Sequence, residues 1–202
     1  MKDLNTYIIE KLKIRKSSYN YFPKTKEELQ DILKDLIEER GNDGDFNDID
    51  TSEITDMSRL FFRVSNFNGN ISKWDVSNVI NMRDMFGFCE SFNCDISNWD
   101  VSNVKNMNGM FMWCESFNQP LNNWNVSNVT NMKEMFYWCE KFNQPLNDWD
   151  VSNVKDMESM FWQCYNFNQP LDKWNVSKIT TIDFMFYECP IEEKNKPKFK
   201  IL

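Results

Sequence analysis

The side chains best suited to chemistry in this chain are its six cysteines, five of which share one spacing. A thiolate is a nucleophile and a ligand for soft metals, and two neighbouring thiols can form a disulfide. No CxxC pair is present, and a cytosolic context favours free thiols. Each of the five closes the same apolar pattern, so we expect small buried hydrophobic side chains there, with a disulfide or a soft metal as the alternative. The five recur at one fixed interval, at Cys89, Cys114, Cys139, Cys164 and Cys189.

Cys94 falls outside this pattern, in the slot that glutamine fills in later copies. It is therefore the candidate for an exposed thiol. The sequence contains no histidine, which excludes His-based acid–base catalysis, Cys–His and Ser–His nucleophile pairs and His-ligated zinc. Carboxylate and thiolate chemistry are not excluded. With nothing to activate Cys94, we expect no catalytic residues, no cofactor and no metal, and predict that the protein is not an enzyme.

The formal net charge of −8 bears on the possible partners. It opposes non-specific binding to nucleic acid and docking on an anionic membrane surface, because both depend on Lys and Arg. No stretch approaches the roughly 20 apolar residues of a membrane span. The N-terminal MKDLNTYIIEKLKIRKSSYNYF lacks the apolar core of a signal peptide. We therefore expect no nucleic-acid binding, no membrane insertion and a cytoplasmic location, unless the chain is exported by a route that leaves no such signal.

Two variable residues follow a repeated phenylalanine in each copy of a pattern, and many of them are aromatic. Large aromatic side chains that the pattern does not need for its core are candidate anchors for a protein partner. The alternative is that they pack against neighbouring copies. The candidate partner-binding residues are Phe88, Trp113, Tyr137, Trp138 and Trp162.

A row of short polar residues forms a second candidate surface. Parallel polar rows could bind a peptide, a glycan or Ca²⁺, although calcium needs six to eight converging oxygens. The alternative is a solvated acidic face. The row consists of Asp75, Asp100, Asn125, Asp150 and Asn175.

Both candidate surfaces belong to a 25-residue repeat that covers most of the chain. A degenerate first copy begins near Asp45, and a sixth begins near Leu171. Self-similarity at a short fixed period is typical of a solenoid, in which each unit contacts only its neighbours. The repeat is marked most clearly by its tryptophans, which recur once per copy at Trp74, Trp99, Trp124, Trp149 and Trp174.

Two periods alternate within each copy. Met132, Phe136 and Cys139 follow helical spacing, which predicts a short α- or 3₁₀-helix. Trp149 and Val151 alternate with a polar residue, which predicts a strand. Stacked copies would then form a narrow parallel sheet with helices on the other side, so the predicted fold is an α/β solenoid.

The two ends of the chain differ from the repeat. Apolar spacing predicts a helix over residues 3–14 and a second one from Thr25 to Gly41, which begins with a capping box and ends at a glycine. The second helix is expected to cap the first copy, with partner docking as its alternative role. We divide the chain into a helical leader and cap at 1–44 and a solenoid at 45–202, with a final edge strand at 198–202.

The phrases WDVSNV-x-NM-x-x-MF-x-x-C and FNQPLNNWNVSNVTNM resemble the repeat of mycoplasma-type and BspA-like leucine-rich-repeat surface proteins. The resemblance covers roughly residues 45–190. It implies a right-handed leucine-rich-repeat-like solenoid and, for many members, surface display, adhesion or partner binding. The leader resembles those found before such repeats in bacterial and phage proteins. We therefore expect a non-enzymatic protein-binding module; a glycan-binding surface adhesin and a structural or virion-associated protein are the alternatives.

Overall fold

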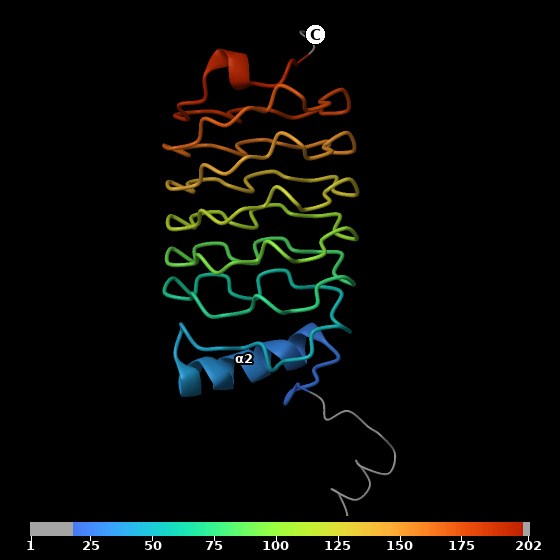
Figure 1. The fold of residues 1–202 in the computed structure, drawn as a ribbon, viewed down its shortest axis with the longest axis vertical. Coiled ribbons are helices and arrows are strands. Elements are labelled where there is room, and N and C mark those ends of the chain that lie inside the picture. Colours follow the sequence, from blue (N-terminus) through green and yellow to red (C-terminus); the bar gives the residue numbers. More distant parts are fainter. Residues whose placement is uncertain (1–17, 200–202) are drawn as a thin grey trace, which may run out of the picture.

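A computed structural model of the chain describes residues 18–199 as a stack of coils that stands on one α-helix (Figure 1). Helix α2 (Lys26–Arg40) lies beneath the first coil, and the 3₁₀-helix η1 (Glu193–Asn195) lies at the opposite end. Neighbouring coils are joined by isolated parallel bridges between residues at equivalent positions of the repeat. We number the six coils by their bridging residues, which are Asp56, Asn81, Asn106, Asn131, Asp156 and Thr181 in order.

Helix α2 begins and ends as its sequence predicts. The Thr25 side chain accepts a hydrogen bond from the Glu28 N–H at 3.2 Å, and the Glu28 carboxylate accepts one from the Lys24 N–H at 2.6 Å. Gly41 ends the helix with a φ of 77°, and its N–H donates to the Ile37 carbonyl at 2.9 Å. The Thr25 side chain thus satisfies one N–H that the helix itself leaves unpaired, and the Glu28 carboxylate pairs with the N–H of the residue before the cap.

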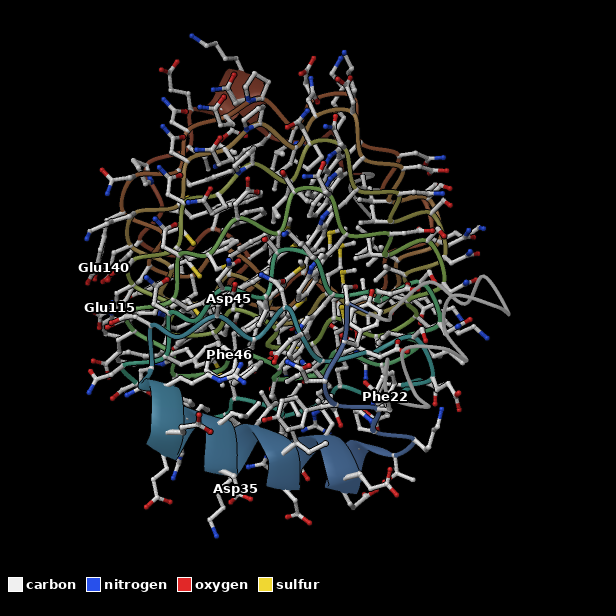
Figure 2. The ribbon with its side chains drawn as sticks, turned by 60° about the horizontal axis from the view of Figure 1, so that its bottom comes forward. Phe22, Asp35, Asp45, Phe46, Glu115 and Glu140 are labelled. Atoms are coloured by element: carbon white, nitrogen blue, oxygen red, sulfur yellow. The ribbon has the colours of Figure 1, made fainter. Side chains whose placement is uncertain are left out.

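One face of α2 is buried and the other faces solvent. Leu29, Leu33 and Leu36 are at most 3% exposed and join the core of the first coil. Asp35 points away from the coils, on the lower side of the helix in Figure 2. The helix therefore covers the first coil as a lid that shields its apolar side chains from water.

The α/β architecture predicted for the repeat, and with it the right-handed leucine-rich-repeat-like unit, is wrong. Within residues 18–199 the only helices are α2 and η1, and that range contains isolated bridges but no strand. The segment predicted as a helix at Met132–Cys139 is a run of tight turns. The segment around Trp149 and Val151 is not a strand.

The predicted helix fails because half of its backbone donors point to another coil. The N–H groups of Met135, Tyr137 and Cys139 donate instead to the carbonyl three residues earlier, at 3.2 Å from Met135 to Met132. Glu134 and Trp138 also have left-handed backbone, with φ of 55° and 58°. Apolar residues at helical spacing can therefore share a face on a run of turns as well as on a helix. The donors to the fifth coil are Met132, Glu134, Phe136 and Trp138, at 2.8–3.0 Å.

The predicted strand fails because its backbone donors are used within the coil. The Trp149 N–H donates to the Leu146 carbonyl at 3.1 Å, and the Asp150 carboxylate accepts from the Ser152 N–H at 3.0 Å. The bond that crosses to the previous coil comes from a side chain, since the Trp149 indole N–H donates to the Leu121 carbonyl at 2.9 Å. The coils are therefore linked here by indoles rather than by a backbone ladder.

Stacked aromatic rings fill the centre of the coils. Phe86, Phe111 and Phe136 are fully buried, and their ring centroids are 5.7 Å apart from one coil to the next. Rings at this separation and nearly parallel attract one another beyond the gain from burial alone. The same core position in every coil therefore favours the same residue, which explains the strict repetition.

Other predictions concern the ends of the chain. The helix predicted at 3–14 lies outside the described residues. Lys198 and Phe199, which begin the strand predicted at 198–202, are not in a strand, and the remainder of that strand lies outside the described part. The division at residue 45 stays a prediction. No helix in the described range 18–199 is both long and apolar enough to cross a membrane.

Candidate partner-binding surface

Each run of turns ends in two adjacent residues whose side chains lie outside the core. The second residue of each pair has left-handed backbone, with φ between 53° and 67°. This conformation is uncommon for bulky residues, and it is held by bonds such as that from the Trp113 N–H to the Tyr137 carbonyl at 2.7 Å. We call the two lines of side chains the first row, Phe62, Gly87, Met112, Tyr137, Trp162 and Tyr187, and the second row, Arg63, Phe88, Trp113, Trp138, Gln163 and Glu188.

The structure brings all five candidate residues together into one line of rings, which we call the aromatic strip. In the second row Phe88 lies 5.9 Å from Trp113, and Trp113 stacks on Trp138 at 4.0 Å between centroids. In the first row Tyr137 lies 5.7 Å from Trp162. The strip changes rows in the fourth coil, where Tyr137 and Trp138 are sequence neighbours with centroids 6.3 Å apart.

The strip is only partly covered. All five candidate residues are half-buried, because each ring packs on a neighbouring ring and remains partly exposed. The sequence offers packing between copies and exposure to a partner as alternatives, but these side chains do both. Preordered rings lose little conformational freedom when a partner binds them.

Two further aromatic residues, one at each end, extend the strip beyond the five candidates. Phe62 begins it, 5.5 Å from Phe88, and its ring lies over Gly87, where a Cβ would be 2.9 Å away. Tyr187 ends it, 4.3 Å from Trp162 and 46% exposed. The 25-residue period identifies both residues, since Phe62 and Tyr187 occupy the first-row position in the first and last coils.

Two arginines already bind rings at the start of the strip. The Arg59 guanidinium lies 4.2 Å from the Phe62 centroid. The guanidinium of Arg63 lies 5.3 Å from Phe62 and 5.4 Å from Phe88. Such contacts are attractive because the ring faces are negative. The geometry of the strip is therefore compatible with a cation above its rings.

Carboxylates border the strip farther along. The Glu140 carboxylate accepts a hydrogen bond from the Trp138 indole N–H at 3.2 Å. Burial raises the pKa of Glu134. The pKa of Tyr137 is raised by burial and then by the charge of Glu134. Glu115 and Glu140 lie at one edge of neighbouring coils (Figure 2), and the pKa of Glu115 is raised by burial and then by the charge of Glu140. These carboxylates give the border a negative charge, and a bound cation would reduce the repulsion between them.

The polar row has a structural use. Each member accepts a hydrogen bond from the N–H of the serine two residues later, as Asp100 does from Ser102 at 3.0 Å. The serine hydroxyl, and after it the serine N–H, lowers the pKa of Asp100 and of Asp150. Between residues 18 and 199 no three Cys, Asp or Glu side chains are grouped as metal ligands. The corresponding bonds elsewhere in the row come from Ser77, Ser127, Ser152 and Ser177, at 3.0–3.2 Å.

The cysteines of the repeat are free thiols, four of them buried in the core, whereas Cys189 is half-buried. Cys139 is fully buried, and its Sγ–H donates to the Phe111 carbonyl at 2.9 Å. Burial raises the pKa of Cys89 to about 12 and that of Cys189 to about 11. Cys94, expected to be the exposed thiol, is half-buried and has a raised pKa as well. Thiols held neutral in this way are poor nucleophiles.

Comparison with known proteins gives one match. A family model described as "Mycoplasma protein of unknown function, DUF285" matches residues 28–137 and again residues 113–199. No curated protein and no solved structure matches the chain significantly. The two matches together cover α2 from its third residue onward, all six coils and η1.

Proposed function

The chain belongs to the Mycoplasma family of unknown function DUF285, and we propose that it is a non-enzymatic module that binds a protein partner through the aromatic strip. One observation carries the proposal: five half-buried aromatic residues from four successive coils stack into a continuous line. Tryptophan and tyrosine dominate the energetics of protein interfaces because they bury much area with little loss of freedom.

The charges around the strip favour a partner segment that carries Lys or Arg. Arg63 already lies over Phe62 and Phe88, whereas the stretch around Trp138 has carboxylates but no such cation over its rings among the described residues. A basic side chain of the partner would find there both a ring face and Glu140 within the same coil. We place the site on the strip rather than on the polar row because the oxygens of that row already shape their own turns.

A narrower kinship with BspA-like surface proteins is part of the proposal. It is supported by the phrase FNQPLNNWNVSNVTNM and its copies, and it concerns the sequence repeat alone. Surface display would follow from that kinship. Labelling of intact producing cells with a reagent that cannot enter them tests this part, and labelling that requires lysis would oppose it.

The proposed binding is tested with a peptide array probed by the purified chain. Peptides that place Lys or Arg next to an aromatic residue should bind, and the same peptides with Glu at the basic position should not. Replacing Trp113, Tyr137 and Trp138 together by Ser should weaken binding more than about 30-fold, the loss of roughly 2 kcal/mol or more that is typical of interface hot spots.

Ile80→Ser provides the matched control. Ile80 is 45% exposed and lies outside both rows, so its loss removes exposed apolar area without touching the strip. Both variants must keep the thermal unfolding midpoint of a folded stack. Equal binding by wild type and the triple variant would move the site away from the strip. Binding that ignores the charge of the peptide would refute the basic partner.

A further inference from the structure

The two ends of the aromatic strip carry opposite charges. The run of turns in the first coil contains Arg59 and Arg63 and no carboxylate. The equivalent run in the sixth coil contains Asp183 and Glu188 and no cation. The first coil lies next to α2 and the sixth lies at the other end of the stack (Figure 1). The strip is therefore positive at the α2 end and negative at the C-terminal end.

The charges at both ends are held by neutral neighbours. Arg63 is exposed, its guanidinium lies over Phe62 and Phe88, and no carboxylate in the described part of the chain pairs with it. The Glu188 carboxylate accepts a hydrogen bond from the Gln163 side-chain amide at 2.5 Å, and no cation among the described residues pairs with it. A guanidinium stacked on a ring keeps its in-plane N–H groups free for a carboxylate. Each end thus presents a positioned charge that lacks its counter-charge.

The order of side chains along the strip is complementary to its own reverse. When a second copy is turned end to end about a two-fold axis that crosses the middle of the strip, its sixth coil meets the first and its fourth meets the third. This operation keeps each row opposite itself, as in an isologous dimer. Arginine then faces glutamate, and tryptophan faces tryptophan. From the first coil to the sixth, the second row reads Arg63, Phe88, Trp113, Trp138, Gln163 and Glu188.

The same reversal accounts for the exposed rings at the negative end. Phe184 is 60% exposed and Tyr187 46%, although both pack on Trp162, at 5.2 and 4.3 Å between centroids. The first coil of the second copy would cover them, and its Arg59 would face the Phe184 ring, a favourable contact between a cation and an aromatic face. Apolar area that a stack leaves open at one end would then be buried.

One pair of like charges also meets in this arrangement. Glu115 of the third coil faces Glu140 of the second copy at the border of the strip. The charge of Lys141 already acts on Glu115 in the opposite direction to that of Glu140, which offsets part of the repulsion. The favourable pairs lie on the strip itself, whereas this one lies beside it.

We propose that the aromatic strip pairs with the strip of a second copy of this chain, turned end to end, so that Arg63 of each copy binds Glu188 of the other and Trp113 packs on Trp138. This inference rests on the proposed function, because it uses the same surface, and it names the partner. The first coil supplies the chemistry expected of that partner, since Phe62 and Arg63 are an aromatic and a basic residue side by side. Complementary charges fix the register and orientation of such a pair.

Charge reversal in two separate chains tests the pairing. Sedimentation equilibrium of the full chain over a wide concentration range should show monomers and dimers. Arg63→Glu places glutamate against glutamate at both symmetric contacts and should weaken dimerisation about tenfold or more, and Glu188→Arg should do the same with two arginines. An equimolar mixture of the two variants should dimerise within about threefold of wild type, because a dimer of one chain of each kind has opposite charges at both contacts.

Lys173→Glu is the matched control. It changes the net charge as Arg63→Glu does, but Lys173 is exposed, belongs to neither row and pairs with Asp148 at 3.0 Å. This variant should dimerise like wild type. All variants must keep the thermal unfolding midpoint of wild type, which shows that the stack remains folded.

A chain that stays monomeric at every concentration would overturn the proposal, as would a mixture that dimerises no better than its two components. Weakening by Lys173→Glu equal to that by Arg63→Glu would also overturn it, since net charge alone would then be responsible. A monomer that still binds basic peptides through the strip would leave the proposed function intact. A dimer restored only in the mixture, with no peptide bound, would support the pairing and count against the peptide form of the proposed function.

Discussion

Gly69 shows how tightly single positions are constrained in this stack. A Cβ at this residue would overlap the ring of Phe46, which is fully buried. Gly87 is tight in a different way, since its hypothetical Cβ meets the Phe62 ring at the edge of the aromatic strip. The same residue type thus serves the core at one site and the surface at the other.

Gly69→Ala should lower the free energy of unfolding by about 1–3 kcal/mol, because an added methyl group in a filled core forces its neighbours out of place. Gly87→Ala should cost under about 1 kcal/mol, since the Phe62 ring can tilt toward solvent. Urea unfolding of both variants measures the difference. Equal costs would show that the Phe46 ring is more mobile than its burial implies.

The buried thiols make the stability of the protein depend on alkaline pH. Burial raises the pKa of Cys89 from 9.0 to about 12, so the folded chain keeps this proton while the unfolded chain loses it. The unfolded state therefore binds fewer protons between these values, and stability falls as pH rises. Below pH 9 the contribution of this thiol is fully present.

The expected fall is about 1.4 kcal/mol per pH unit for each thiol held neutral, between pH 9 and the folded pKa. Urea unfolding at pH 7.5, 9 and 10.5 measures it. Cys89→Ala should lose less stability over this range than wild type, whatever its own stability at pH 7.5. A parallel loss in both proteins would assign the alkaline dependence to other groups.

At the scale of the element, the run of turns replaces the helix that its apolar spacing predicts. A helix and a run of turns bury the same face, but they favour different residues at the positions with left-handed backbone. A helix loses about 1 kcal/mol for an internal glycine, whereas a left-handed position gains from glycine because the Cβ clash disappears. Ser159 has a φ of 54°, and Gly109 occupies the equivalent position two coils earlier.

Ser159→Gly should therefore stabilise the chain by about 0.5–1 kcal/mol, which is opposite to the effect expected in a helix. Ser159→Ala keeps the Cβ and should bring no such gain. Both free energies of unfolding come from urea titrations. Destabilisation by the glycine variant alone would support a helical segment and contradict the run of turns.

For the whole molecule, identity of neighbouring coils is what makes the stack possible. Each coil bonds only to the coils on either side, through partners at equivalent positions of the repeat. Stability of such arrays is close to a sum over units and their contacts. A coil removed as a whole leaves its two neighbours able to pair with each other.

Deletion of residues 126–150 should therefore give a folded chain with lower stability and a smaller denaturant dependence, because less surface is buried. Deletion of residues 126–149 leaves one extra residue in the register and should disrupt the coils around it. The full deletion also removes Trp138, so the near-ultraviolet circular dichroism of the stack between Trp113 and Trp138 should disappear. Unfolding of both deletions alike would contradict the exchangeability of the coils.

Much of the candidate surface follows from the sequence because the period reports it directly. Residues one period apart occupy equivalent places, so Trp113 and Trp138 had to be neighbours once the copies stacked. Phe62 was not among the candidate residues because the first copy of the repeat is degenerate. The helix α2 was also predictable, since its cap, its apolar stripe and its final glycine are local features.

The sequence by itself determined the period, the positions that share a core, the cap and the five central residues of the aromatic strip. Tertiary structure alone decided the backbone between them. The spacing of Met132, Phe136 and Cys139 suits a helix and a run of turns equally, and only the coil that receives the N–H groups of Glu134 and Trp138 selects between the two. Hydrogen bonds between residues far apart in the chain leave no local pattern, which is why the backbone of the repeat could not be predicted from the sequence.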